Sequence, residues 1–315
     1  MNIEEHFRES AIWQDFQKAL GRKVYTAAGD GWRYVAVLRH SGMFSRLYCD
    51  YGPVAESAEA LRDALRSLKD LARKLGAVLV RVQPLGIEYN PQDYGMIKIP
   101  FGQPEYTRVL DLTQSEDEIL LAMRKTNRNV YRNYHKKGMT YRESNNPAEI
   151  GELVRMLREV EEHNGLSFLS DEYYKVQSQV LMSAGNAKLH FIEYKNEIIA
   201  AAMTYDGPNT REYAHAGASH EHRQLAAPTA LLVEMIMGAK RAGQKEFDFG
   251  GITILDDPTH KYYGFSQFKR SFGGEVKELS ATYDIPVKKV TYLAYTALKN
   301  MADFVVGIKN KVFKR

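Results

Sequence analysis

The clearest periodicity in the chain lies at residues 58–74, AEALRDALRSLKDLARK, where apolar residues recur every three or four positions. This spacing predicts an amphipathic helix, which Gly76 terminates. The run that follows, AVLVRVQP, is apolar and β-branched, as in a buried strand, and Pro84 ends it. The two segments together predict one α/β unit.

The second half of the chain carries a longer series of the same signals. Helices are predicted at residues 149–163 and 228–242, and strands at 188–207, 210–219 and 245–251. The first strand segment is a hairpin that turns at Lys195 and Asn196, and the next strand pairs with it. A fainter version of this order, with strands at 33–40 and 46–52, precedes the helix at residue 58. A repeated α/β architecture is therefore expected, without an internal repeat of sequence.

Composition narrows the class of protein. The chain has 315 residues, of which 44% are hydrophobic and 26% charged, as expected for two globular domains or one large one. Cys49 is the only cysteine, which excludes an intramolecular disulfide framework and a cysteine-based zinc site. The start of the chain, MNIEEHFRES, is acidic where a signal peptide is basic, and no run of eighteen apolar residues occurs. A cytoplasmic protein without a membrane span is predicted.

The basic residues are concentrated in two places, and the first is the end of the chain. Residues 286–315 hold seven basic residues and one acidic residue, Asp303. In this tail, Tyr292, Tyr295, Leu298, Met301 (or Ala302) and Val305 follow at spacings of three and four, which predicts one apolar face of a helix. Such a helix suits peripheral contact with an anionic membrane surface. The alternative is a terminal helix that packs on the body of the protein.

The second basic concentration is residues 124–142, RKTNRNVYRNYHKKGMTYR, which contains no acidic residue and three tyrosines. Cations interleaved with aromatic rings suit a polyanion such as RNA. A solvated helix face is the alternative. The candidate RNA contacts are Arg124, Lys125, Arg128, Arg132 and Lys136, of which all but Lys125 are four residues apart and would line one helix face.

One further segment, FSQFKRSFGGE (265–275), places Lys269 and Arg270 within a run of aromatic residues and glycines. A solvated turn does not need those aromatic residues, and a buried helix does not normally accept the lysine. Lys269 is therefore a candidate functional cation, with a lysine extending from a helix end to solvent as the alternative.

Five short segments, taken in order, resemble the Fem-type (FemABX) peptidoglycan-bridge aminoacyltransferases. They are YGPV (51–54), KTNRNVYRNYHKKG (125–138), AHAGAS (214–219) followed by Arg223 and Pro228, DFGG (248–251) and FKRSFGG (268–274). The resemblance implies two acetyltransferase-like (GNAT-like) α/β domains packed together, plus a C-terminal basic helix. Residues 1–106 would form the first domain, completed by about 276–315, and residues 107–275 the second. The coiled-coil arm of some members is missing, so this is the armless form.

The resemblance also implies an activity. Family members transfer an amino acid from aminoacyl-tRNA to a side-chain amine of the stem peptide of a peptidoglycan precursor, with no further cofactor and no metal. Lys269 matches the family's lysine, which would stabilise the negative oxygen of the tetrahedral intermediate, and Phe268 matches a neighbouring aromatic residue. Tyr173, Tyr213 and His215 match substrate-contacting positions, although His215 is equally consistent with a hydrogen-bonded, half-buried histidine. Asp248 is expected to fix the end of its strand through backbone bonds.

Three positions depart from the family pattern. Relatives that use a nucleotide-linked precursor bind its phosphates with a lysine, matched here by Gln17 with Lys18 adjacent, and an arginine, matched here by Leu169. A first-domain aspartate that contacts the stem peptide is matched by Gln83. These departures favour the lipid-linked precursor, lipid II, at the inner face of the membrane over UDP-MurNAc-pentapeptide.

Two alternative functions remain open. An acyl-CoA acetyltransferase needs backbone N–H groups at a glycine-rich turn, but RQLAAPTALL (223–232) has alanines for glycines and adds Pro228, which lacks an N–H. A non-catalytic adaptor that binds tRNA or membrane would use the same two basic regions without needing Lys269. His220 and His222 lie two apart on a predicted turn and do not make a metal site without a distant third ligand.

Overall fold

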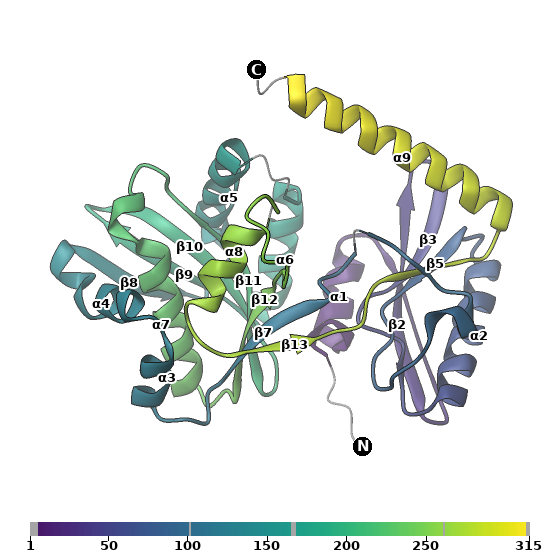
Figure 1. Cartoon of the computed structure of the whole chain (residues 1–315), viewed down its shortest axis with the longest axis horizontal. Helices are drawn as coiled ribbons and strands as arrows, with labels where there is room; N and C mark the ends of the chain where they lie inside the picture. Colours follow the sequence, from purple (N-terminus) through teal and green to yellow (C-terminus); the bar gives the residue numbers. More distant parts are fainter. Residues whose placement is uncertain (1–5, 101, 165–167, 261, 313–315) are drawn as a thin grey trace. The chain divides into compact units, whose positions relative to one another are not determined.

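The structure is a computed structural model that describes residues 6–100, 102–164, 168–260 and 262–312. The chain divides into two compact units (Figure 1). Unit 1 comprises Met1–Glu9, Gly21–Gln103 and Ser280–Arg315, and unit 2 comprises Ser10–Leu20 and Pro104–Leu279. Each unit has one seven-stranded sheet with helices, which confirms the predicted α/β fold. Residues Ser10–Leu20 belong to unit 2, whereas the predicted domain boundaries put them in the first domain.

Unit 1 is built on a sheet of strand order β1-β2-β3-β5-β14-β6, with β4 paired to β2. Helix α2 begins after the N-cap Ser57 and buries Leu61, Leu65 and Leu68 in the core of this unit. The elements are η1 (Phe7–Glu9), β1 (Lys23–Gly29), β2 (Trp32–Ser41), β3 (Phe44–Cys49), β4 (Val54–Ala55), α2 (Ala58–Lys74), β5 (Leu79–Val82), η2 (Pro91–Tyr94), β6 (Ile97–Lys98), β14 (Tyr283–Pro286) and α9 (Lys289–Val312). Strand β14 pairs with β5, so residues about 200 positions apart complete one sheet.

Helix α9, drawn in yellow in Figure 1, corrects the predicted apolar face of the tail. Tyr292 and Tyr295 are buried against Val78 and Leu79, but Leu298 and Met301 are 54% and 66% exposed. The physical reason is that three helical residues turn about 300°, so successive i+3 steps drift by about 60° each and reach the opposite side. The side chains of Ala302 and Val305 lie outside the described part of the chain.

Unit 2 has the strand order β13-β7-β12-β11-β10-β9-β8. The predicted hairpin forms β9 and β10 and turns at Lys195 and Asn196, whose φ angles are 50° and 63°. The elements are α1 (Ala11–Ala19), β7 (Tyr106–Asp111), α3 (Glu116–Ala122), α4 (Lys125–Asn133), η3 (His135–Lys137), β8 (Met139–Ser144), η4 (Pro147–Glu149), α5 (Ile150–Asn164), α6 (Asp171–Ser183), β9 (Ala187–Tyr194), β10 (Glu197–Asp206), β11 (Thr210–Ala218), η5 (Arg223–Leu225), α7 (Ala227–Arg241), β12 (Glu246–Gly251), α8 (Tyr263–Arg270) and β13 (Glu275–Glu278).

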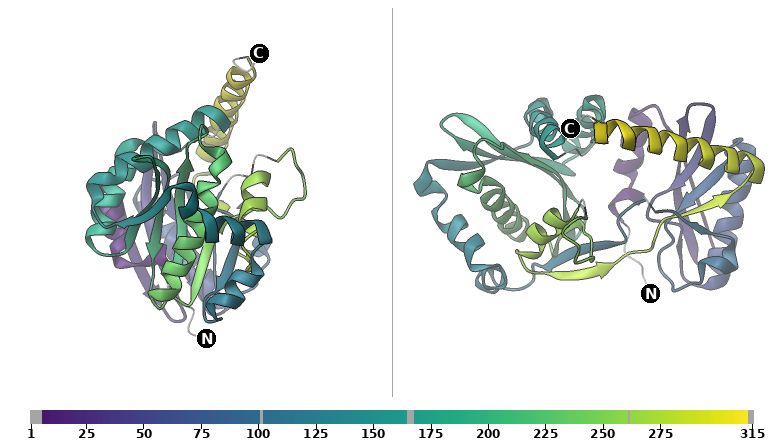
Figure 2. Two further views of the ribbon diagram at one scale, coloured as in Figure 1. Left: turned by 90° about the vertical axis from the view of Figure 1, so that its left-hand side faces the viewer. Right: turned by 45° about the horizontal axis from the view of Figure 1, so that its top comes forward.

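The sheet of unit 2 is covered by helices on both faces. Helix α7 packs on one face, with Ala200 and Ala202 of β10 in the main core cluster. Figure 2 shows helices on either side of this sheet. Helix α5 approaches the other face so closely that a Cβ on Gly217 would lie 2.8 Å from the Met156 carbonyl oxygen. Within the described residues, no helix has the length and apolarity that crossing a bilayer requires.

Candidate active site

The position of Lys269 is fixed by the way helix α8 ends. Lys269 lies in the last turn, and the chain then reverses through Gly273 and Gly274, whose φ angles are 88° and 73°. A Cβ on Gly274 would lie 2.5 Å from the Val109 carbonyl oxygen of β7, so only glycine fits there. The two glycines therefore let β13 pair with β7 directly after the helix and hold Lys269 against the sheet.

The Lys269 ammonium is half-buried and points to the end of β12. Its Nζ donates a hydrogen bond to the Gly251 carbonyl oxygen at 2.8 Å, and a Cβ on Gly250 would lie 3.6 Å from Nζ. Burial lowers the pKa of Lys269 to about 8, although the negative charges of Asp248 and Glu212 act to raise it. Most Lys269 side chains are therefore charged at pH 7. Because burial disfavours the charged form, this ammonium loses its proton more readily than that of a surface lysine.

Two carboxylates lie side by side on neighbouring parallel strands, because Glu212 of β11 is in register with Asp248 of β12. Asp248 accepts hydrogen bonds from the Thr107 hydroxyl and from the Gly250 N–H, the latter at 2.7 Å. The second bond is the strand-end contact predicted for this residue. Burial and the charge of Glu212 nevertheless raise the pKa of Asp248 to about 6. The site thus combines one cation with a carboxyl group that is poised near neutral pH.

Phe268 and Lys269 point in different directions, since consecutive helical residues diverge by about 100°. Phe268 packs on the core of unit 2, and its ring centroid lies 5.0 Å from that of the fully buried Phe272. Phe265, the third aromatic residue of this helix, is 42% exposed. Phe268 thus anchors the helix that carries Lys269.

Tyr213 and His215 lie on opposite faces of the sheet. Strand β11 pairs Tyr213 with Thr204 and His215 with Met203, so Ala214 is an extra residue in a β-bulge. Tyr213 packs in the α7-side cluster, where burial raises the pKa of its hydroxyl. The structure therefore does not bring these two predicted substrate contacts together on one face. An alternating sequence pattern gives no sign of a bulge.

His215 instead belongs to a cluster of polar and aromatic side chains between β10, β11 and α6. Its Nε2 lies 2.8 Å from the Tyr205 hydroxyl and 3.0 Å from Oε1 of the fully buried Gln177. The Tyr174 ring packs edge-on at 5.0 Å. These contacts are those of the hydrogen-bonded, half-buried histidine that the sequence left open as an alternative.

The same region includes Tyr173 and helix α1. Tyr173 lies in the first turn of α6, which Ser170 caps, and its ring contacts Phe16 and Tyr174 at 5.2 and 5.8 Å. Trp13 packs on Tyr205 at 5.9 Å. Sequence reasoning placed α1 in the other domain and missed this aromatic cluster, although the spacing of Trp13 and Phe16 marks one buried helix face.

Lys18 belongs to unit 2 and Gln83 to unit 1. Lys18 is exposed and pairs with Asp15 at 2.9 Å. Gln83 is fully buried, and its amide donates to the Ser280 carbonyl oxygen at 2.6 Å. Gln83 therefore ties the returning end of the chain to β5. Leu169, at the position of the family's arginine, is exposed.

The basic segment forms a shorter helix than predicted. Helix α4 ends at Asn133, so Arg124 is its N-cap and Lys136 lies in the following η3 turn. Arg128 is not a free surface cation, because its guanidinium donates to the carbonyl oxygens of Leu120, Leu121 and Met123 at the end of α3. The exposed candidates for RNA contact are Arg124, Lys125, Arg132 and Lys136.

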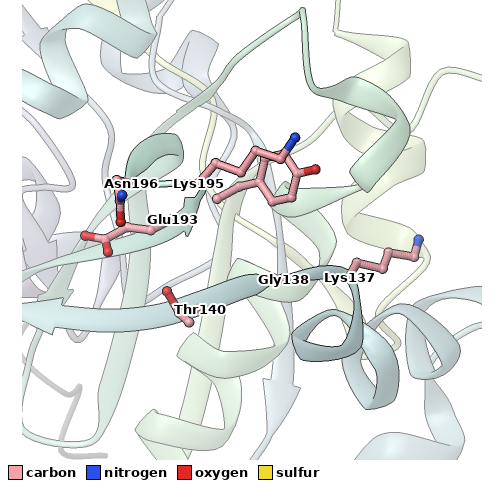
Figure 3. Close-up of a pocket in the computed structure, with 7 residues that line it drawn as sticks. Lys137, Gly138, Thr140, Glu193, Lys195 and Asn196 are labelled. Carbon is pink, nitrogen blue, oxygen red and sulfur yellow. The ribbon is translucent and has the colours of Figure 1, made fainter.

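An open depression of about 450 Å³ lies beside this segment (Figure 3). Lys137, Gly138, Thr140, Glu193, Tyr194, Lys195 and Asn196 line it. Figure 3 shows Glu193 pointing away from Lys137, so the depression presents both signs of charge. None of the predicted catalytic or substrate-binding residues lines it. Among the residues that the structure describes, no group of three or more His, Cys, Asp or Glu side chains could hold a metal ion.

Comparison with known proteins gives two kinds of similarity. Residues 177–300 match the family model of the FemAB family. A segment of 112 residues is 30% identical to the aminoacyltransferase FemA of Staphylococcus aureus, and it covers 35% of this chain but only 27% of FemA. The chain therefore matches about a quarter of the length of these curated relatives.

Among solved structures, the crystal structure of FemX has a TM-score of 0.79 at 16% identity and covers 92% of this chain and 94% of that chain. L-PGS from Bacillus licheniformis has a TM-score of 0.56 at 14% identity, over 94% of this chain and 98% of that one. A tandem GNAT protein from the clavulanic acid biosynthesis pathway has a TM-score of 0.55 at 13% identity, over 84% and 83%. These identities show the fold alone. The FemAB match at residues 177–300 and the fold shared with FemX agree with the resemblance that the motifs of the sequence suggested.

Proposed function

We propose that this protein is an aminoacyltransferase that forms an amide between an activated amino acid and the side-chain amine of a peptidoglycan stem peptide. The observation that carries the proposal is Lys269: a half-buried ammonium at a glycine-rich strand end, within FemAB-family sequence. Its relative FemA is an aminoacyltransferase by name. The donor that we infer is aminoacyl-tRNA.

In the proposed reaction, the acceptor amine nitrogen attacks the carbonyl carbon of the aminoacyl ester. The carbonyl oxygen becomes negative in the tetrahedral intermediate, and the Lys269 ammonium donates a hydrogen bond to it. The carbon–oxygen ester bond then breaks, the ribose hydroxyl leaves with a proton, and the attacking nitrogen loses one. Because the pKa of Lys269 is about 8, the ammonium is present at neutral pH without a metal being required for this role.

One feature of helix α7 disfavours use of acyl-CoA at the corresponding turn. The helix begins at Ala227 after Ala226, which has a φ of 55° and provides no side-chain cap. Pro228 removes one of the N–H groups that a pyrophosphate would need. The similarity to a tandem GNAT protein concerns the fold alone, so the aminoacyl ester remains the better-supported donor.

The acceptor that we favour is lipid II. Lys18 is already paired with Asp15, and the loop position of the family's arginine is the exposed Leu169. Neither residue offers the free cation that binding of a soluble nucleotide's phosphates calls for. The test is transfer of label from a charged total-tRNA pool to lipid II and, separately, to UDP-MurNAc-pentapeptide. Transfer to lipid II alone supports the proposal, transfer to the nucleotide alone contradicts the choice of acceptor, and transfer to neither contradicts the function.

For the donor, replacing Arg132 or Lys136 by alanine is expected to weaken tRNA binding. Each change should reduce the slope of log K against log salt concentration by about 1, because each exposed cation would neutralise a phosphate. The measurement is a filter-binding or fluorescence titration at several salt concentrations.

Two control variants sharpen this titration. Lys74→Ala removes an exposed lysine from α2 of unit 1 and should leave the slope unchanged. Arg128→Ala should instead lower thermal stability, because it exposes the carbonyl groups at the end of α3. Unchanged slopes for Arg132→Ala and Lys136→Ala would exclude this segment from the RNA contact.

A further inference from the structure

Helix α9 has two different long faces over its described side chains. The inward face is fastened to unit 1 through Tyr292 and Tyr295. Tyr295 accepts a hydrogen bond from the Arg46 guanidinium at 2.8 Å and packs edge-on against Phe44 at 5.5 Å. Tyr292 is 7% and Tyr295 is 5% exposed, and both pack with Val78 and Leu79. This contact fixes which way the rest of the helix faces.

The outward face is apolar and exposed. Val290 is 83% exposed, Leu293 67%, Leu298 54% and Met301 66%. At about 100° per residue, these four side chains and Ala294 and Ala297 fall within about 140° of one another around the helix. They form a stripe about 16 Å long at 1.5 Å per residue. We call Val290, Leu293, Leu298 and Met301 the outward stripe.

The charge next to the outward stripe is positive. Lys288 and Lys289 are exposed at the start of the helix, and at about 100° per residue Lys289 lies about 40° from Leu293 at the edge of the stripe. Lys299 is half-buried and falls on the face of the two tyrosines. By sequence, the residues from 286 to the end of the chain contain seven basic residues and only Asp303 as an acid. An apolar stripe with lysines beside it matches the interface of a bilayer that contains anionic lipids, in which the apolar side chains enter the acyl boundary and the lysines contact headgroups.

A second copy of the chain fits this surface less well. A stable protein interface buries about 800 Å² on each partner, with a depletion of lysine at its core. Four separate aliphatic side chains on one helix, with lysines beside them, provide less apolar area than that. A lipid surface needs no complementary partner shape and is favoured by the same lysines.

We propose that the outward stripe of α9, together with Lys288 and Lys289, is a membrane-docking surface for anionic bilayers. The inward tyrosines hold the helix on unit 1, and the stripe enters the headgroup region parallel to the membrane plane. The inference stands apart from catalysis, but it gives the enzyme a means of reaching a lipid-linked acceptor.

The test is co-sedimentation of the full chain with vesicles of equimolar phosphatidylglycerol and phosphatidylcholine, and with vesicles of phosphatidylcholine alone. The parent should sediment with the anionic vesicles and much less with the neutral ones. The double variant Val290→Glu, Leu293→Glu should lower the bound fraction at least about fivefold, because two charges enter the apolar stripe. Leu121→Glu is the matched control, since Leu121 is 69% exposed on α3 of unit 2, and it should bind as the parent does.

Absence of sedimentation by the parent with anionic vesicles would overturn the proposal, as would equal sedimentation by the double variant. Light scattering in solution tests the remaining outcome. If the parent is a dimer that does not bind vesicles and the double variant is a monomer, the stripe is an interface between two copies of the chain. Transfer to lipid II dissolved in detergent needs no vesicle. The double variant should therefore keep the parent's rate of this transfer, which separates a failure of this proposal from a failure of the proposed catalysis.

Discussion

Replacing Lys269 by alanine is expected to slow the aminoacyl transfer step by about 10²- to 10³-fold, equivalent to about 2.7–4 kcal/mol of transition-state stabilisation. The side chain is held by its own hydrogen bond to the Gly251 carbonyl oxygen and by the end of α8, so it needs little reorganisation to meet a developing oxyanion. The measurement is the single-turnover rate of transfer from charged tRNA to lipid II at saturating acceptor.

Arg270 provides the matched control for this substitution. It is the next residue of the same helix and is exposed, so Arg270→Ala removes a neighbouring positive charge without touching the end of β12. Its transfer rate should stay close to that of the parent. Affinity for tRNA should be unchanged in Lys269→Ala, because the proposed RNA contacts lie on other residues. A Lys269→Ala variant that keeps the parent's rate would contradict the role of this lysine and would favour the non-catalytic adaptor.

The pH dependence of the same assay shows whether the positive charge of Lys269, rather than the shape of its side chain, supports the reaction. The ammonium is the form that stabilises an oxyanion, and since the pKa of Lys269 is about 8, this contribution is present below pH 8 and lost above it. An arginine stays charged throughout this range. Lys269→Arg should therefore remove the alkaline loss if it retains activity. A parent whose rate rises steadily to pH 10 would show that the charge on Lys269 does not limit the reaction.

The helices at residues 58–74, 149–163 and 228–242 and the strands between residues 187 and 251 could be predicted from the sequence because their signals are local. The helix at residues 58–74 has the same bounds in the structure, and the hairpin turns at Lys195 and Asn196 as expected. The short strands β6, β13 and β14 gave no such signal, since two to four residues hold no periodicity and their pairing depends on partners far along the chain. Tertiary pairing, rather than propensity, decides these strands.

The candidate site was predictable in part, for a related reason. The run of aromatic residues and glycines around Lys269 indicated a functional cation, but the turn at Gly273 and Gly274 that follows the helix was not predicted. The β-bulge at Ala214 was not predictable, because one extra residue changes the face of His215 without changing the composition of the strand. Arg128 was taken for a surface cation because four-residue spacing describes a helix face but not the carbonyl groups at the end of the preceding helix.

Replacing Asp284 by asparagine is expected to destabilise unit 1 by about 3–5 kcal/mol, which is the usual cost of leaving a buried charge without its partner. Asp284 and Arg81 are cross-strand neighbours in β14 and β5 and form a two-pronged ion pair with N···O distances of 2.7 and 2.9 Å. Their side chains are 2% and 10% exposed. Loss of the carboxylate would leave the Arg81 guanidinium with a neutral partner on this side, the Tyr48 hydroxyl at 3.1 Å, in place of a charged one.

Urea unfolding can measure this change in unit 1 separately, because the chain has two tryptophans and each unit holds one. In a Trp13→Phe background, fluorescence reports Trp32 of unit 1 alone. Asp63→Asn is the matched control, since the Asp63–Arg66 pair is exposed and should contribute less than about 1 kcal/mol. An Asp284→Asn variant that is no less stable than this control would contradict the prediction.

A double replacement distinguishes the charge from the packing. Arg81→Met together with Asp284→Leu removes both charges and should recover most of the stability lost in Asp284→Asn, because apolar residues of similar volume often replace a buried ion pair without loss. The Tyr292 hydroxyl lies 3.5 Å from Asp284 Oδ2, so the carboxylate also lies under the first turns of α9. If the double variant regains stability but binds anionic vesicles more weakly than the parent, the ion pair serves to orient the outward stripe. If stability and vesicle binding both recover, Tyr292, Tyr295 and Arg46 are sufficient to anchor helix α9.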